Sequence, residues 1–270
     1  MMNKDFYQPS PDLSEFVDEK PGDSYVQSLA RGLAVIRSFS ADRPAQTLSQ
    51  VAEVTGLTRA GARRLLLTLE KLGYAHADGR QFRLTPKILD LGFSYLSTMP
   101  FWQLAQPVME DLALSVGESC SISVLEGWEA LYVLRVPTRK IMSINLSVGS
   151  RLPAYCTSMG RVLLAGLSPR ELDAVLAETP LKRHTPGTIV EVPKLKAVIA
   201  EIRVKGWASI YRELEEGLVS VAAPIINRQG AWIAAMNVSG HALSYTEEEF
   251  CARFLPPLRN AAQAVSDLLI

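Results

Sequence analysis

Hydrophobic residues recur every three or four positions along residues 58–73, which is the spacing of an α-helix that buries one face. The apolar side consists of Ala62, Leu65, Leu66, Leu69 and Leu72. Thr58 stands at the start as a helix N-cap, and Gly73 stands where a glycine ends a helix in the left-handed conformation. The pattern therefore predicts one amphipathic helix over this segment.

The residues before and after this helix predict a winged helix-turn-helix. Residues 47–57 have the spacing of a short helix, with a capping box at Thr47 and Gln50 and a glycine, Gly56, that permits a tight turn. Residues 28–39 have helical apolar spacing as well. After the main helix, two short strands flank an Asp-Gly turn and predict a β-hairpin. The predicted winged helix-turn-helix domain covers residues 25–86.

A different composition follows. Residues 87–96 predict a linking helix that is apolar on more than one side, within a linker that reaches residue 100. Beyond it the periodicity alternates between helices and strands, which predicts an α+β domain with a mainly antiparallel sheet over residues 101–270. The predicted helices cover 103–116, 158–167, 169–178, 193–205 and a last segment capped by Thr246. The predicted strands cover 121–126, 130–136, 140–148, 207–212, 218–226 and 232–239.

Charge separates these segments, although the whole chain is neutral. Residues 25–87 contain ten basic and four acidic residues, a net charge of +6. Residues 1–24 contain two basic and six acidic residues and several prolines, which predicts a disordered acidic tail. Such a tail is unlike a secretory signal, and the sequence has no apolar run long enough to span a membrane. These features predict a cytoplasmic protein whose basic segment binds an anionic partner.

The helix over residues 58–73 has the outline of a DNA recognition helix. Its polar side carries four basic residues, and small residues at its start allow close approach to a surface. Such helices place their first turns in the major groove, where arginine pairs with guanine or neutralises phosphate. The alternatives are a surface helix with a solvated basic face and a winged helix that contacts protein. The predicted DNA-binding residues are Thr47, Thr58, Arg59, Ala60, Gly61, Arg63, Arg64, Thr68, Lys71, Arg80 and Arg83.

From residue 25 onward the chain resembles the IclR family of bacterial transcription regulators. The resemblance is carried by residues 28–36 (SLARGLAVI), 146–161 (LSVGSRLPAYCTSMGR), 213–218 (ELEEGL) and 237–239 (NVS). Within the family, the chain is most similar to the regulators of aromatic-acid catabolism, the PcaR, PcaU and PobR type.

The resemblance implies a homodimer, often paired into tetramers, that binds double-stranded operator DNA. It also implies a GAF/profilin-like C-terminal domain that binds a small organic-acid effector, such as 4-hydroxybenzoate, protocatechuate or β-ketoadipate. RNA polymerase is an expected partner if the protein is an activator. Activation and repression both occur in this subgroup, so the sign of regulation stays open.

A small acid needs a cation or several N–H and O–H donors, together with an apolar wall. Residues 149–161 supply such donors beside a predicted helix N-terminus, which is itself a site for anions. The resemblance implies that Ser158, Met159, Ser220, Asn237 and Ser239 line the effector site. The full predicted set adds Arg135, Ile141, Ile144, Arg151, Tyr155 and Thr157.

Several of these residues have structural alternatives. Ser220 and Ser239 lie between apolar neighbours, where a hydroxyl can bond to the backbone. Arg151 is expected to pair with an acid or to hold the loop rather than to bind the effector. Arg161 is expected to be a surface or interface charge. Asn237 is the stronger candidate, because an amide in an apolar strand needs partners.

The residue types do not favour an enzyme. Cys156 lies among hydroxyl-bearing residues, but none of the three histidines stands with an orienting acid at a recognisable spacing. The three cysteines are far apart and predict neither disulfides nor a metal site. No phosphate-binding glycine loop is present, and no cofactor is expected. Cys156 is instead predicted to be a small buried residue that lines the effector pocket.

Overall fold

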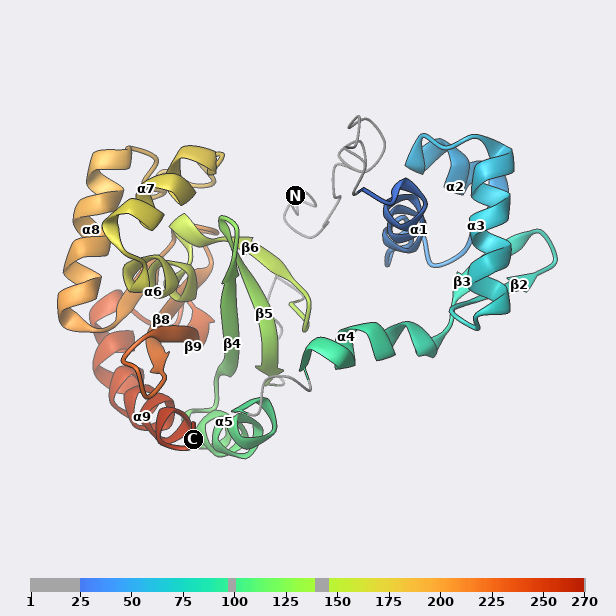
Figure 1. Cartoon of the computed structure of the whole chain (residues 1–270). Coiled ribbons are helices and arrows are strands. Elements are labelled where there is room, and N and C mark those ends of the chain that lie inside the picture. Colours follow the sequence, from blue (N-terminus) through green and yellow to red (C-terminus); the bar gives the residue numbers. More distant parts are fainter. Residues whose placement is uncertain (1–24, 97–100, 139–145, 270) are drawn as a thin grey trace. The chain divides into compact units, whose positions relative to one another are not determined.

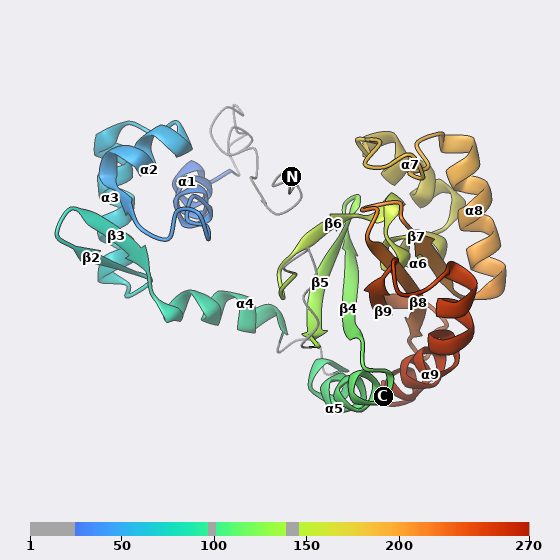
Figure 2. The same ribbon diagram turned by 180° about the vertical axis from the view of Figure 1, so that it is seen from behind.

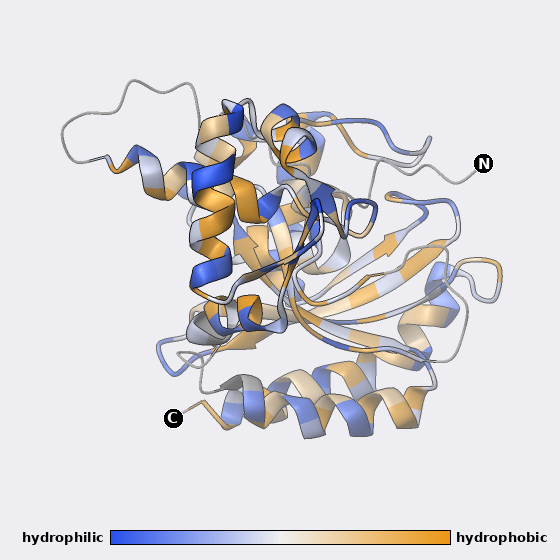
Figure 3. Cartoon of the chain, turned by 90° about the vertical axis from the view of Figure 1, so that its right-hand side faces the viewer, coloured by the Kyte–Doolittle hydropathy of each residue, from blue (hydrophilic) through white to orange (hydrophobic). Residues whose placement is uncertain are grey.

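The computed structural model describes residues 25–96, 101–138 and 146–269, and these residues form two compact units divided between residues 96 and 101 (Figure 1). The tail predicted over residues 1–24 lies outside the described residues. Coloured by hydropathy, the helices carry both hydrophobic and hydrophilic positions along their length (Figure 3). This is the pattern of helices that bury one side and expose the other.

The first unit is a winged helix, as predicted. Its elements are α1 (Gln27–Arg37), β1 (Gln46–Thr47), α2 (Leu48–Thr55), α3 (Arg59–Lys71), β2 (Ala75–Asp78), β3 (Gln81–Leu84) and, after a 3-10 turn (Pro86–Ile88), α4 (Leu89–Leu96). Thr47 and Gln50 form the predicted capping box, and Thr58 caps α3 by accepting from the Gly61 N–H at 3.1 Å. Gly56 has φ +66°, the left-handed conformation that the turn between α2 and α3 requires. The core comprises Val35, Val51, Ala52, Ala62, Leu66, Leu69 and Ala75.

Two details of this unit differ from the prediction. Leu72 is 53% exposed, because α3 ends at Lys71 and the chain turns away from the core there. Strand β1 was not predicted, since two residues carry no periodicity; Gln46 pairs with Phe82 of β3 and ties the start of α2 to the wing.

The second unit is built on a six-stranded sheet, in the order β6-β5-β4-β9-β8-β7, in which every pair is antiparallel. The strands are β4 (Ser119–Glu126), β5 (Glu129–Val136), β6 (Arg151–Pro153), β7 (Ala208–Tyr211), β8 (Leu218–Ile226) and β9 (Trp232–His241). The helices are α5 (Phe101–Val116), α6 (Ser158–Gly166), α7 (Pro169–Glu178), α8 (Val192–Lys205) and α9 (Glu247–Asp267), with a 3-10 turn, η4 (Ala154–Cys156), before α6. This is the predicted α+β domain.

Helices cover both faces of this sheet. Helices α5 and α9 pack together on one face, and α6 packs on the other face with α8 behind it, as both views show (Figures 1 and 2). Because paired residues of antiparallel strands point to the same side, the register assigns each side chain to a face. Ile122, Val221 and Val238 point toward α5 and α9, whereas the residues that alternate with them point toward α6. The α6 side includes four polar residues: Ser121, Ser220, Asn237 and Ser239.

The strand predicted over residues 140–148 is wrong where the structure describes it. Residues 146–150 form a turn rather than a strand, with Gly149 at φ +89° and its N–H bonded to the Tyr132 carbonyl at 2.7 Å. The edge strand is instead β6, whose Leu152 pairs with Ala130 of β5. The rest of the predicted strand, residues 140–145, lies outside the described residues.

Candidate DNA-binding and effector-binding sites

Helix α3 presents a basic surface on the side away from its core. Ala62, Leu66 and Leu69 are buried, while the predicted DNA-binding residues of this helix lie on its exposed side, apart from the partly buried Gly61. The exposed members are Thr58, Arg59, Ala60, Arg63, Arg64, Thr68 and Lys71. Thr68 Oγ1 donates to the Arg64 carbonyl at 2.7 Å, so its hydroxyl is occupied within the helix. The small residues at the start of α3 leave its N-terminal backbone accessible.

The β-hairpin adds two cations to this unit. Arg80 lies exposed in the turn between β2 and β3, and Arg83 lies exposed on β3, opposite His76. Glu70 of α3 accepts from the Ala77 N–H at 3.3 Å and thereby ties the hairpin to the helix. Thr47 is partly buried, and its hydroxyl is hydrogen-bonded within the capping box of α2. These contacts hold the wing and the helix as one surface.

The cations of this surface have no carboxylate partner in the part of the chain that the structure describes. Within the described residues, no carboxylate forms an ion pair with Arg59, Arg63 or Arg64, nor with Lys71, Arg80 or Arg83. Unpaired surface cations raise the local potential and attract phosphate. The arrangement suits an anionic partner that contacts helix and wing together.

In the second unit, polar side chains lie buried on the α6 side of the sheet. The register places Ser121 of β4 beside Asn237 of β9, and Ser220 of β8 beside Ser239 of β9. All four are at most 5% exposed. Buried polar groups need hydrogen-bond partners, and Ser239 has one within the sheet, since its Oγ donates to the Ser119 carbonyl at 3.4 Å. This set, together with Ser158 of α6, is called the serine–asparagine site below.

Helix α6 contributes its first turn to the site. Ser158 is 1% exposed and shares a hydrogen bond of 2.8 Å with Ser220 Oγ. Thr157 is the N-cap of the helix, since its Oγ1 accepts from the Gly160 N–H at 3.2 Å. A Cβ at position 160 would lie 2.3 Å from the Ala154 Cα, so only glycine lets η4 pack so closely on α6. Met159 is buried in the apolar core beneath.

The two candidate arginines have different surroundings. Arg135 of β5 pairs in register with Ser121 and donates from Nη1 to the Ser121 Oγ at 3.2 Å, so its side chain does face the α6 side. Arg151 pairs with Leu131 on the opposite side of the sheet, and its guanidinium lies 2.8 Å from Glu126 and 3.3 Å from Glu129. The structure therefore brings Arg135, but not Arg151, to the serine–asparagine site.

Tyr155 and Cys156 are buried, but their polar atoms point elsewhere. The Tyr155 hydroxyl donates to the Lys182 carbonyl at 2.6 Å, accepts from the Lys182 N–H, and lies 2.9 Å from His184 Nε2. Burial raises the pKa of Tyr155, so the hydroxyl stays protonated. Burial likewise raises the pKa of the Cys156 thiol to about 12, which fits an inert core residue rather than a nucleophile. Ile141 and Ile144, the predicted apolar wall, lie outside the described residues.

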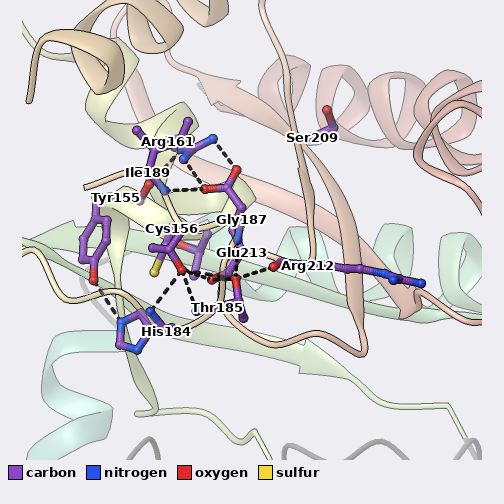
Figure 4. A network of polar contacts seen from close by, with 12 residues as sticks. Tyr155, Cys156, Arg161, His184, Thr185, Gly187, Ile189, Ser209, Arg212 and Glu213 are labelled. Atoms are coloured by element: carbon purple, nitrogen blue, oxygen red, sulfur yellow. Dashed lines mark hydrogen bonds and ion pairs between the residues drawn. The ribbon is translucent and has the colours of Figure 1, made fainter. Parts of the chain in front are cut away.

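The burial of Arg161 differs from the expectation. This residue was expected at the surface or an interface, but it is 2% exposed and forms a two-pronged ion pair with Glu213 at 2.8 and 2.5 Å (Figure 4). Its Nε also donates to the Tyr155 carbonyl at 2.8 Å. The sequence could not show this, because Glu213 lies 52 residues away in the β7–β8 connection.

A polar network extends from this ion pair into the loop between α7 and α8. Thr188 Oγ1 donates to the Glu213 carbonyl at 2.6 Å. Thr185 Oγ1 donates to the Arg212 carbonyl at 2.6 Å (Figure 4). Arg212 has φ +57°, a left-handed backbone that this contact helps to hold. Burial, and then nearby Lys182, lowers the pKa of His184, which stays neutral beside Tyr155. The network joins η4, α6, the loop and the β7–β8 connection.

Ser121 and Ser123 of β4 were missed as site residues. In residues 119–124 (SCSISV) serine alternates with an apolar residue, which reads as a strand with one solvated face. The structure buries both faces, and Ser121 and Ser123 are each 0% exposed. The alternation was a signal for the site, but only the packing of α6 over β4 shows that its polar side is internal.

The same two units occur in known proteins. The model of the IclR helix-turn-helix domain matches residues 28–79, and that of the bacterial transcriptional regulator IclR C-terminal domain matches residues 93–267. The chain belongs to the IclR family. It is therefore a transcription regulator with a helix-turn-helix domain for DNA binding, not an enzyme. No helix of its described residues is long and apolar enough to cross a membrane.

One relative and two solved structures show how similar known proteins are to this chain. The Pca regulon regulatory protein of Pseudomonas putida is 43% identical over 88% of this chain and 82% of its own. A transcriptional regulator from Rhodococcus sp. RHA1 has a similar structure, with a TM-score of 0.83 and 49% identity over 91% of this chain and 98% of its own. An IclR homologue from Microbacterium hydrocarbonoxydans, complexed with 4-hydroxybenzoate, has a TM-score of 0.80 and 28% identity, covering 90% and 98%.

Proposed function

We propose that this IclR protein regulates genes of aromatic-acid catabolism and that a small aromatic or dicarboxylic acid, bound at the serine–asparagine site, alters its operator binding. The observation that carries the proposal is the buried polar face under α6, with Arg135 at its β5 side. An arginine with hydroxyl and amide groups supplies what a carboxylate with a polar substituent needs. The names of the Pseudomonas relative and of the 4-hydroxybenzoate complex support the same chemistry.

A melting experiment tests this effector. A ligand that binds only the native state raises the melting temperature, by about 1.4 kcal/mol of added stability at ten times its Kd. We expect 4-hydroxybenzoate, protocatechuate or β-ketoadipate to raise the melting temperature, and an unrelated fatty acid to leave it unchanged. Replacing Asn237 by leucine should abolish the rise. If no acid of the panel shifts the melting temperature, the aromatic-acid assignment is wrong, while the family assignment is untouched.

The DNA-binding part of the proposal assigns operator contact to α3 and the wing. In this arrangement residues 25–86 bind DNA, residues 87–100 link the two units, and residues 101–270 bind the effector. The effector can change DNA affinity only if it binds one arrangement of the chain better than another. Helix α4 is the segment through which such a difference would pass. We place this activity in the cytoplasm, with RNA polymerase as a further partner if the protein activates transcription.

We also propose that the protein acts as a homodimer, the form in which two recognition helices meet a pseudo-palindromic operator. Helix α1 and the residue before it support this with exposed apolar side chains: Val26, Leu29 and Leu33 are 61%, 63% and 40% exposed. In the same unit α4 exposes Leu89 and Leu91, at 70% and 47%. Clustered apolar exposure of this kind marks a protein contact.

Replacing Leu29 by glutamate should shift the protein from dimer to monomer, because a charge at the centre of an apolar contact would be buried unpaired. Sedimentation analysis of the purified protein measures the change. Val204 of α8 is 89% exposed and offers a matched control, since a glutamate there should leave the dimer intact. A dimer that persists in the Leu29 variant would remove α1 from the interface.

A further inference from the structure

Two buried polar atoms of the second unit have no hydrogen-bond partner within its described residues: the Oγ of Ser123 and the Oδ1 of Asn237. Ser123 is 0% exposed and Asn237 is 4% exposed. An unpaired buried polar atom costs free energy, and native proteins rarely keep one without a reason. Both atoms belong to side chains on the same face of the sheet, which points to one shared partner.

The register places these two side chains close together. Ser123 of β4 pairs with Ala235 of β9, and Asn237 pairs with Ser121, so Ser123 and Asn237 are diagonal neighbours on the α6 side. Diagonal neighbours lie within reach of one small group between them. A hydroxyl group can accept from the Ser123 hydroxyl and donate to the Asn237 Oδ1 at once. A carboxylate or keto oxygen only accepts, and would leave the Asn237 oxygen unpaired.

Arg135 fixes where the other end of such a ligand lies. Its guanidinium is 3.2 Å from the Ser121 Oγ, and Ser121 lies two residues from Ser123 on the same strand. Two residues of a strand span about 6.6 Å, close to the length of a benzene ring between its para substituents. A carboxylate held by Arg135 would therefore place a para-hydroxyl group beside Ser123.

We infer that Ser123 is a specificity-determining residue of the effector site, and that its hydroxyl, together with Asn237, binds the ring hydroxyl of a hydroxylated aromatic acid. This inference rests on the proposed function, because it takes the serine–asparagine site to be the effector site. It makes that function more specific, because the site should bind a hydroxybenzoate more tightly than benzoate or an aliphatic keto-dicarboxylate.

Calorimetric titration of the full chain tests the inference with two ligands that differ only by the hydroxyl, 4-hydroxybenzoate and benzoate. Replacing Ser123 by alanine should lower the affinity for 4-hydroxybenzoate about tenfold, because the substitution leaves a polar group of the complex unpaired. Benzoate should bind the variant as well as, or better than, the wild type, because the unpaired hydroxyl is gone. For the same reason the ligand-free variant should melt no lower than the wild type.

The control is Ser209→Ala. Ser209 lies on β7 of the same sheet, in register with Val221 on the other face, and its hydroxyl contacts Glu247. This variant should leave the ratio of the two affinities unchanged.

Every other outcome would overturn either the role of Ser123 or the proposed effector. Equal losses for both ligands in Ser123→Ala, or wild-type protein that binds benzoate as tightly as 4-hydroxybenzoate, would overturn the role of Ser123. Binding of β-ketoadipate in place of the aromatic acids would also overturn it, while the site for a small acid would stand. Wild-type protein that binds none of the three would overturn the proposed effector and this inference with it.

Discussion

Replacing Arg161 by methionine is expected to destabilise the second unit by about 3–5 kcal/mol, because it leaves the Glu213 charge buried without its partner. Arg161 is 2% exposed and Glu213 is 9% exposed, so water cannot take over the lost contacts. For a unit of this size the loss corresponds to a fall of about 6–20 °C in melting temperature. Thermal unfolding followed by circular dichroism measures it.

The stability that Arg161→Met loses should depend on pH. Burial raises the pKa of the Glu213 carboxyl, and the Arg161 guanidinium opposes that rise. Without Arg161 the pKa rises further, so the folded variant holds a proton that the unfolded carboxyl has lost. Stability then falls as pH rises through the folded-state pKa. The deficit of Arg161→Met should accordingly be largest near pH 8 and shrink toward about pH 5.

Two further variants separate the buried charge from other effects. In Arg161→Met with Glu213→Leu the unpaired charge is gone, so most of the lost stability should return. Lys196 and Asp173 form an exposed pair at 2.6 Å, and Lys196→Met should cost under about 1 kcal/mol. A double variant as unstable as the single one would show that packing of the arginine stem, rather than the charge, holds this region.

Local signals in the sequence were sufficient for most of the fold. The caps at Thr47, Thr58 and Thr246 each accept a hydrogen bond from a backbone N–H group, as predicted. Such caps act within four residues, so a single sequence contains the whole interaction. The winged helix and the antiparallel sheet follow from these starts and from apolar periodicity.

Features that depend on distant residues were not accessible in this way. Arg161 read as a surface charge because its partner, Glu213, is far along the chain. The β4 serines were not predicted as site residues, because the packing of α6 over their face has no local signature. Strand β6 is three residues long and depends on pairing with β5. Of the site, the sequence offered the serines and Asn237 through resemblance, but not their grouping with Ser121 and Ser123.

Replacing Arg63 by alanine is expected to weaken operator binding by about 5- to 150-fold, the range for loss of one two-pronged contact to a base. Arg63 is exposed on α3, beside the buried face of Ala62, Leu66 and Leu69, and no carboxylate of the described residues pairs with it. Binding to an unrelated duplex should fall much less, because phosphate contacts are shared among several cations. Fluorescence anisotropy with a selected operator and a scrambled duplex measures both affinities.

The salt dependence of the same titrations separates the roles that Arg63 can have. A residue that reads a base alters the affinity for one sequence, while a residue that neutralises phosphate lowers the slope of log affinity against log salt by about 1 for every sequence. Equal losses on both duplexes would therefore assign Arg63 to phosphate contact. Arg170, exposed on α7 of the second unit, is the matched control, and Arg170→Ala should change neither affinity. Wild-type binding that does not respond to salt would mean that the basic surface of α3 and the wing contacts protein instead of DNA, since counterion release accompanies every phosphate contact.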